Sequence, residues 1–325
     1  HFLFGLDAFC VFSAPYAVHT LAPDCCRAKE LGFPIRGYVY CCPGQANYLG
    51  GDIVSGIAAV DLYKQEEICV FLDIGTNGEL VIGNKEFLVA GAGAAGPALE
   101  GGSVKTGMRA EPGAVDRVQI SDGQIKIHAI GEAKPRGICG SGIVDLLAEM
   151  FLNGWIDIKG RYVRGASEKI REIDGELAAE YGPELFFFQK DIEEFLKTKA
   201  AAGTMVEYMM GEVGLTMNDI GRFYVAGAFG THISKEAGVT LGLYPDIPRE
   251  QIILPGNTSL AGARKILLQR KVREEIEEVL DGMAYIQFGA VDNFLHLMVA
   301  AEAIPHTDMH RYPSVEKELK KRGLL

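Results

Sequence analysis

The feature that most constrains the fold is the apolar run at residues 68–72, Ile-Cys-Val-Phe-Leu, which ends at Asp73. A short continuous apolar run is typical of a central strand that is covered on both faces. Two further apolar runs follow at residues 80–82 and 87–90, and turn-forming residues separate them. We therefore expect a three-stranded meander over residues 68–90, with Asp73 at the end of its buried first strand.

Other parts of the chain predict an alternation of helices and strands. Asp122-Gly123 lies between two alternating segments and predicts a hairpin over residues 118–127. Periodic apolar residues predict helices over residues 52–63 (with Asp52 as N-cap), 97–100, 143–150, 191–211 and 260–280, and a strand is expected at 223–226. Residues 153–186 have mixed charge and a weak pattern, so we interpret them as a variable insertion. The basic segment 317–322 predicts a solvated terminal helix.

Composition narrows the class of protein. The chain has 325 residues, enough for about two domains, and its 48% hydrophobic content excludes a disordered protein. A net charge of −11 argues against a nucleic-acid or anionic-membrane partner. No apolar run is long enough for a membrane span, and we see no secretory signal pattern. Because the chain begins at His1 without a Met, we interpret it as a fragment or as having an incomplete N-terminus.

The seven cysteines, an odd number in a chain without a signal, favour a cytoplasmic location. Two adjacent pairs, Cys25-Cys26 and Cys41-Cys42, leave two interpretations open. One is a metal or iron–sulfur site, although the spacing matches neither a zinc ribbon nor a ferredoxin. The other, which we favour, is a set of free thiols.

Three glycine-rich segments, residues 73–79, 137–142 and 225–230, follow strands or open helices. In the first, backbone N–H groups and the Thr76 hydroxyl could contact a phosphate, while Asp73 could hold a metal ion or its water. The second could place N–H groups and Ser141 at a helix N-terminus, which favours anions. The third could seat a nucleoside. The alternatives are a polar hairpin turn for the first segment and a helix cap with close packing for the second.

These motifs also carry a family resemblance. Asp-Ile-Gly-Thr-Asn-Gly-Glu at 73–79 resembles the second phosphate motif of the actin, sugar kinase and Hsp70 superfamily. From about residue 15 to about residue 308, the chain resembles one branch of it, the C-terminal domain of the ATP-dependent reductive activators of corrinoid proteins. The segments that carry this likeness are 94–101, 107–110, 137–142, 226–230 and 256–263; residues 50–54 look like the segment that precedes the phosphate motif.

The resemblance implies an α/β, actin-like ATPase fold with ribonuclease H-like lobes, of which this chain would be the second half plus part of the preceding lobe. Residues 1–67 would end the preceding, middle region, and residues 68–325 would form the actin-like C-terminal domain. Family members use ATP to drive reduction of Co(II) to Co(I) in a corrinoid protein, which restores a methyltransferase. Their electron comes from a [2Fe–2S] cluster in an N-terminal domain, which is absent from this chain.

The resemblance also implies a site. Asp73 would be the catalytic residue and would hold Mg²⁺ through water. The cofactor-binding residues for ATP would be Gly75, Thr76, Asn77, Gly78, Gly140, Ser141, Gly142, Gly227, Phe229 and Gly230. The family's first phosphate motif lies upstream, and this chain contains no second copy of it. We therefore interpret the chain as the nucleotide-binding and partner-docking part of a longer activator.

Two other functions stay open at this point. A small-molecule kinase of the same superfamily would need an acid or base near the γ-phosphate, for which Glu100 and Asp52 are candidates. A non-enzymatic module would dock a corrinoid protein or methyltransferase without nucleotide. A homodimer is conceivable, because the C-terminal tail and residues 153–186 could supply contacts.

Overall fold

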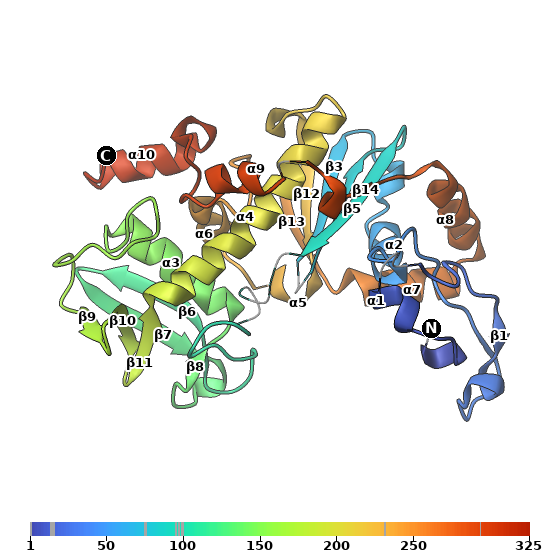
Figure 1. Ribbon diagram of the computed structural model, residues 1–325, viewed down its shortest axis with the longest axis horizontal. Coiled ribbons are helices and arrows are strands. Elements are labelled where there is room, and N and C mark those ends of the chain that lie inside the picture. Colours follow the sequence, from blue (N-terminus) through green and yellow to red (C-terminus); the bar gives the residue numbers. More distant parts are fainter. Residues whose placement is uncertain are drawn as a thin grey trace.

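The centre of the computed structural model is a six-stranded mixed sheet (Figure 1). The structure describes residues 2–13, 17–74, 77–94, 96, 98, 101–230, 232–292 and 294–325, without the side chains at 12, 94, 228, 229 and 290. The strand order is β13-β12-β3-β4-β5-β14. The bounds are β3 Ile68–Ile74, β4 Asn77–Gly83, β5 Leu88–Ala94, β12 Ile220–Ala226, β13 Ile252–Gly256 and β14 Ala284–Gln287. Strands β3, β4 and β5 pair antiparallel, which confirms the predicted meander.

Helices cover both faces of this sheet. Val70 and Leu72 of β3 belong to one hydrophobic core together with Met209 of α4 (Gln189–Glu212). Cys69 and Phe71 point the other way, into a second core with α2 (Gly51–Ala59), α7 (Thr258–Leu268) and α8 (Arg270–Gly282). Alternate side chains therefore face opposite cores, as a doubly covered central strand requires.

Two smaller sheets form the other half of the molecule. One has the order β7-β6-β8, and α3 (Gly140–Leu152) packs on β6. Its strands are β6 Ala114–Ser121, β7 Gln124–Ala129 and β8 Gly137–Ile138. The predicted hairpin is confirmed, with Asp122 and Gly123 at φ 51° and 72°. The second sheet, β11-β10-β9, extends from residue 170 to residue 188 and so lies mostly within residues 153–186; its bounds are β9 Ile170–Ile173, β10 Glu176–Gly182 and β11 Leu185–Phe188. This segment is therefore more ordered than its sequence pattern indicated.

The remaining elements are short. They are α1 Phe9–Phe12, β1 Cys26–Arg27, β2 Tyr38–Val39, α5 Gly227–Gly230, α6 Lys235–Leu241, α9 Phe294–Ala301 and α10 Pro313–Lys321, with single 3₁₀ turns at Phe2–Phe4, Ala28–Leu31, Leu62–Lys64, Ile130–Glu132, Met217–Asp219, Phe288–Ala290 and Met309–Arg311. The chain-terminal helix predicted from residue 317 is confirmed as α10, although it begins earlier.

Two sequence predictions about helices are wrong in detail. The helix expected over residues 260–280 is divided at Gln269, which is extended at φ −127° and ψ 101°, so that α7 and α8 each pack separately. Asp52 is not the N-cap of α2; Gly50 holds that position without a side-chain cap, and the helix ends at Ala59. The short helix expected at 97–100 falls mostly outside the described residues.

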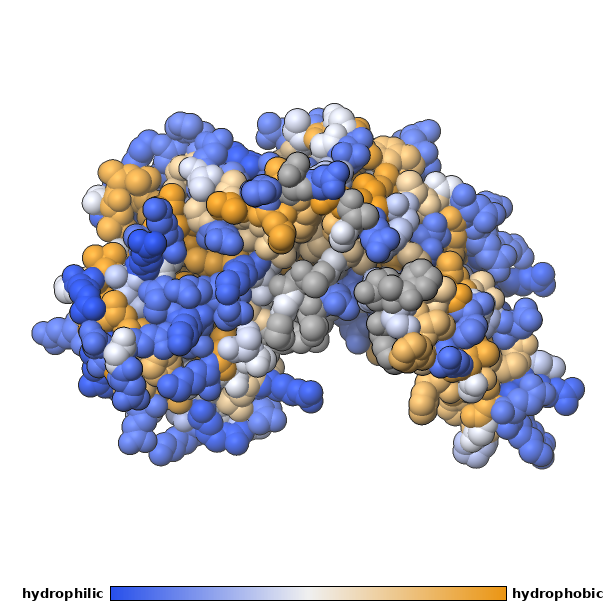
Figure 2. All heavy atoms as spheres, viewed as in Figure 1, coloured by the Kyte–Doolittle hydropathy of each residue, from blue (hydrophilic) through white to orange (hydrophobic). Residues whose placement is uncertain are grey.

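The whole molecule has the form of an arch. Figure 2 shows a wide hollow between the half that contains β6–β11 and the half that contains β1, α7 and α8, and α5 lies at the roof of this hollow in Figure 1. Helix α4 runs across both halves (Figure 1). Among the described residues, no helix has both the length and the apolar character needed to cross a membrane.

Candidate functional site

The carboxyl ends of β3 and β12 bring two of the predicted motifs together. Asp73 is the register partner of Ala226, the last residue of β12, and α5 begins at the next residue. Gly227 has φ 88°, and a Cβ built on it would lie 2.7 Å from Asp73 Oδ1. Glycine is needed at 227 for both reasons, because other residues rarely adopt this backbone conformation and have no room beside the carboxylate. In parallel α/β sheets, the carboxyl ends of strands are where ligands bind.

Three carboxylates gather at this end of the sheet. Asp73 and Glu79 face each other across β3 and β4, and Asp52 lies at the start of α2. Burial, and then the charge of Asp52, raise the pKa of Asp73 to about 6. Burial, Asp52 and Asp73 together raise the pKa of Glu79 to about 7. Each carboxylate is therefore harder to ionise than in water, because like charges share a partly desolvated space.

These three carboxylates are better placed to bind a cation through its water molecules than to coordinate it directly. Among the described residues, no set of three or more His, Cys, Asp or Glu side chains is close enough to hold one metal ion. Magnesium prefers oxygen ligands and commonly keeps several of its waters. The carboxylates of Asp52, Asp73 and Glu79 are therefore suited to accept hydrogen bonds from the waters of a Mg²⁺–nucleotide complex.

The other predicted residues divide into three sets. Asn77 is exposed and Gly78 buried at the start of β4, next to Asp73. Gly230 is buried, and a Cβ there would lie 2.6 Å from Val225 O, so close packing explains this glycine. Gly75, Thr76 and the side chain of Phe229 lie outside the part of the chain that the structure describes.

The Gly140–Gly142 segment has a packing explanation of its own. It opens α3, as predicted, and all three residues are buried. A Cβ at Gly142 would collide with the carbonyl oxygen of Val115 on β6. Ser141 Oγ lies 3.5 Å from Cys139 Sγ. These contacts favour the cap-and-packing alternative for Gly142, while a nucleotide contact by Gly140 and Ser141 stays a prediction.

Sequence reasoning missed the roles of Asp52 and Glu79 in this group. Asp52 was interpreted as a helix cap or as a kinase acid or base, and Glu79 only as part of the motif. For Glu79 there is a local signal: it lies six positions after Asp73, and in a tight hairpin this spacing places both side chains on one face of the sheet. The approach of Asp52 comes from the packing of α2 and has no local signal.

The paired cysteines lie near β1 and β2, and Cys42 packs against the start of α2, where a Cβ on Gly51 would lie 2.4 Å from the Cys42 carbonyl oxygen. All seven cysteines are free, and Cys25 is exposed. Burial, Asp52 and Cys41 raise the pKa of Cys42 to about 12, and burial also raises that of Cys41. Thiols bind metals as thiolates, so these two groups are poor ligands as they stand.

The fold defines the class: this is an actin-like ATPase domain, known as an ASKHA domain. Residues 67–316 match the family model described as the C-terminal domain of RACo, the ASKHA domain, and residues 1–65 match the RACo middle region. The chain therefore belongs to the RACo C-terminal domain family, as its motifs indicated.

Relatives and a solved structure agree with this assignment. The chain is 29% identical to the corrinoid activation enzyme RamQ of Eubacterium limosum, over 75% of this chain and 44% of that protein. It is 28% identical to the [Co(II) methylated amine-specific corrinoid protein] reductase of Methanosarcina barkeri, over 73% of this chain and 46% of that protein. A solved reductive activator for a corrinoid, iron–sulfur protein superposes with a TM-score of 0.89 at 38% identity, over 97% of this chain and 52% of that one. The chain thus spans about half the length of these proteins.

Proposed function

We propose that this chain binds Mg²⁺–ATP at the carboxyl ends of β3 and β12, as the nucleotide-binding part of a corrinoid reductive activator. The observation that carries the proposal is the approach of Gly227 to the Asp73 carboxylate, at the carboxyl ends of two neighbouring strands. Backbone at such a position can contact a phosphate closely because no side chain intervenes. Membership of an actin-like ATPase family supports the same conclusion.

The carboxylates give this site its chemistry. Mg²⁺, when bound, would neutralise phosphate charge. Asp73 would hold the ion through water and would not act as a covalent nucleophile. A cation bound here would offset the mutual repulsion of Asp73, Glu79 and Asp52, which adds to the effect of burial in raising the pKa of Asp73 and of Glu79.

Nucleotide binding would act on a partner through the shape of the arch. The two halves border one hollow (Figure 2), so a ligand that contacts both favours a closed population over an open one. Either hydrolysis drives this closure, or binding alone stabilises a conformation that changes the ligands of the corrinoid cobalt. A relative is named for activation of a corrinoid protein and another for its reduction, so the partner proposed here is a corrinoid protein that serves a methyltransferase. Its electron would come from a [2Fe–2S] domain elsewhere in the longer protein, in the cytoplasm.

The proposal is tested by calorimetric titration of this chain with Mg²⁺–ATP and Mg²⁺–ADP. We expect saturable binding that needs Mg²⁺ and that weakens at least tenfold in Asp73→Ala, because the metal-water ligand is lost. Gly227→Ala should weaken binding similarly, since its Cβ would displace the Asp73 carboxylate. Asp281→Ala, on the exposed surface of α8, is the matched control and should bind as the wild type does.

An absence of binding in the wild-type chain would overturn the proposal for this chain. It would instead favour a docking module, or a site that is complete only together with the preceding lobe. The same titration on the full-length gene product separates these two outcomes.

A further inference from the structure

Helix α6 is connected to both glycine-rich segments that are predicted to contact the nucleotide beside Asp73. It begins at Lys235, shortly after α5 ends at Gly230, and it packs against α3, which opens with residues 140–142. Residues 237–241 of α6 are buried. Because closely packed elements transmit displacement, a shift of α6 would move the end of one segment and press on the helix that carries the other.

The loop that follows α6 turns back and packs closely on it. A Cβ on Gly238 of α6 would lie 2.4 Å from the Tyr244 ring, so this contact requires glycine. Further along the loop, the carbonyl oxygen of Arg249 accepts from Lys235 Nζ at 2.8 Å. Residue 249 is therefore held beside the first turn of α6.

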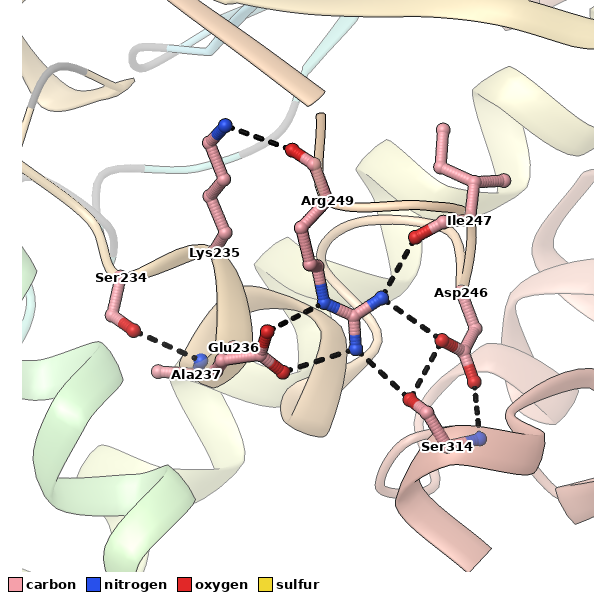
Figure 3. Close-up of polar contacts among 8 residues, drawn as sticks. All are labelled: Ser234, Lys235, Glu236, Ala237, Asp246, Ile247, Arg249 and Ser314. Atoms are coloured by element: carbon pink, nitrogen blue, oxygen red, sulfur yellow. Dashed lines mark hydrogen bonds and ion pairs between the residues drawn. The ribbon is translucent and has the colours of Figure 1, made fainter. Parts of the chain in front are cut away.

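The Arg249 side chain joins α6 to the C-terminal helix α10 (Figure 3). Its Nε and Nη2 donate to the two carboxylate oxygens of Glu236 on α6, at 2.9 and 3.1 Å. Nη1 donates to Asp246 Oδ1 at 3.0 Å and to the carbonyl oxygen of Ile247 at 2.8 Å. Nη2 also donates to Ser314 Oγ at 2.9 Å. One guanidinium thus binds α6, its own loop and α10, which its fork of five N–H donors permits.

The first turn of α10 is attached to the same group by a second set of contacts. Asp246 Oδ2 accepts from Ser314 N, and Asp246 Oδ1 accepts from Ser314 Oγ, both at 2.7 Å. The Asp246 side chain is 4% exposed and that of Arg249 25%, so solvent screens these charge-assisted bonds only in part. The Glu236 side chain is 71% exposed, and its pair with Arg249 depends on the two-pronged geometry.

We propose that Arg249 is a positioning residue of the nucleotide site, which couples the attachment of α10 to the position of α6 and thereby to the two glycine-rich segments. This inference rests on the nucleotide binding proposed above. Coupling between two equilibria is reciprocal. An attached α10 therefore strengthens Mg²⁺–ATP binding by the same factor by which Mg²⁺–ATP stabilises the attachment of α10.

The test combines calorimetric titration with hydrogen exchange on the purified chain. Arg249→Met removes all five donors and keeps an apolar stem, so we expect the affinity for Mg²⁺–ATP to fall about fivefold. In the wild type, saturating Mg²⁺–ATP should slow the exchange of residues 314–321 by about the same factor, while residues 270–282 of α8 keep their rate. In Arg249→Met this effect of the nucleotide on α10 should disappear.

Glu236→Ala separates coupling from simple support of α10. It removes the partner of Arg249 on α6 but leaves the contacts of Arg249 with Asp246 and Ser314. Without nucleotide, α10 should therefore exchange at the wild-type rate. The slowing by Mg²⁺–ATP should nevertheless fall by about half or more, since only the Lys235 contact still connects α6 to residue 249. This variant also serves if Arg249→Met does not fold.

Arg270→Met is the matched control. It breaks an Arg–Glu pair on α8, at a side chain that is 90% exposed, and should leave both the affinity and the nucleotide effect on α10 as in the wild type. Wild-type binding with unchanged affinity in Arg249→Met and Glu236→Ala would overturn the coupling alone. So would wild-type α10 exchange that Mg²⁺–ATP does not slow, or full slowing in both variants. An absence of binding in the wild type would overturn the proposed function and this inference with it.

Discussion

Two carboxylates on α3 accept hydrogen bonds from the part of β6 that extends beyond its short pairing with β8. Asp145 and Glu149 lie one helical turn apart and accept hydrogen bonds from the N–H groups of Val118 and Ile120 on β6, at 3.4 and 2.9 Å. These backbone donors would otherwise lack a partner within the sheet, and unpaired edge groups invite association with other strands. Burial first, and then the charges of Glu149 and Asp116, raise the pKa of Asp145 to about 6.

This pKa predicts a pH-dependent effect of Asp145→Asn. Between pH 4 and 6 the folded protein retains a proton that the unfolded chain releases, so the wild type loses stability as pH rises through this interval. Asparagine keeps an acceptor for Val118 N–H and carries no charge. We expect its free energy of unfolding to exceed that of the wild type by about 2 kcal/mol at pH 8 and to equal it near pH 4.

Urea denaturation at the two pH values measures this difference. Glu86→Gln, at a side chain that is 73% exposed, should change the free energy of unfolding by less than about 0.5 kcal/mol at either pH. A stabilisation of Asp145→Asn that is the same at pH 4 and pH 8 would contradict the assignment.

Among the elements, α2 and α7 are packed against each other unusually closely. A Cβ at Gly262 of α7 would collide with the carbonyl oxygen of Ser55 on α2. On the facing side, a Cβ at Gly56 would lie 2.7 Å from the Phe71 ring. Gly262 is therefore required by the approach of the α2 backbone and Gly56 by the Phe71 ring, and α2 in turn places Asp52 where its charge acts on Asp73. The position of this helix pair decides the geometry of the carboxylate group.

Gly262→Ala is accordingly predicted to force α7 away from α2. We expect the free energy of unfolding to fall by about 2 kcal/mol or more, as measured by chemical denaturation. Gly282→Ala is the comparison variant, because a Cβ at that end of α8 meets nothing within 4 Å and its effect should be neutral or slightly stabilising. Equal free energies of unfolding for the two variants would contradict this prediction, because α7 could then move away from α2 without a loss of stability.

In the whole molecule, one long helix and the C-terminal segment connect parts that are far apart in the sequence. Helix α4 packs against β5 of the central sheet and against β10 and β11 of a small sheet. The last 25 residues return to α4 through Lys199, and to the loop after α6 through the contacts of Ser314 with Asp246 and Arg249 that Figure 3 shows. The cavity that is lined by α4, residues 242–247 and residues 301–313 therefore takes part of its wall from the end of the chain.

The contact between Asp246 and Ser314 should control how firmly α10 is attached. Asp246→Ala removes the acceptor of the Ser314 N–H and hydroxyl and leaves Arg249 with one partner fewer. We expect hydrogen exchange of residues 313–321 to become about 30-fold faster, equivalent to about 2 kcal/mol of local stability. Glu318→Ala, at an exposed pair with Arg322, should leave the exchange of 313–317 unchanged. Unaltered exchange in Asp246→Ala would contradict this prediction and would show that the apolar contacts of Val315 and Leu319 are sufficient to hold α10 in place.

The meander at 68–94, the hairpin at Asp122-Gly123 and the helices α3 and α4 were predictable because their signals are local. A buried strand reads as a continuous apolar run, and a helix shows apolar residues three and four positions apart. The position of Asp73 at the end of β3 and the glycine-rich loop after β12 were predictable for the same reason. The residue types at these two positions also carried the family resemblance.

The sequence by itself therefore determined the central strands and helices, the family, and the two loops of the candidate site. Only the tertiary structure decided which other residues lie near Asp73 and Gly227. Asp52 acts on Asp73 because Gly262 allows α7 to hold α2 in place, Gly142 is explained by the backbone of β6, and the break between α7 and α8 lies at the extended residue Gln269. The cavity beside Gly203 joins segments up to about 110 residues apart. Contacts between such distant segments leave no periodic trace in the chain, since they depend on how surfaces fit and not on the spacing of residues.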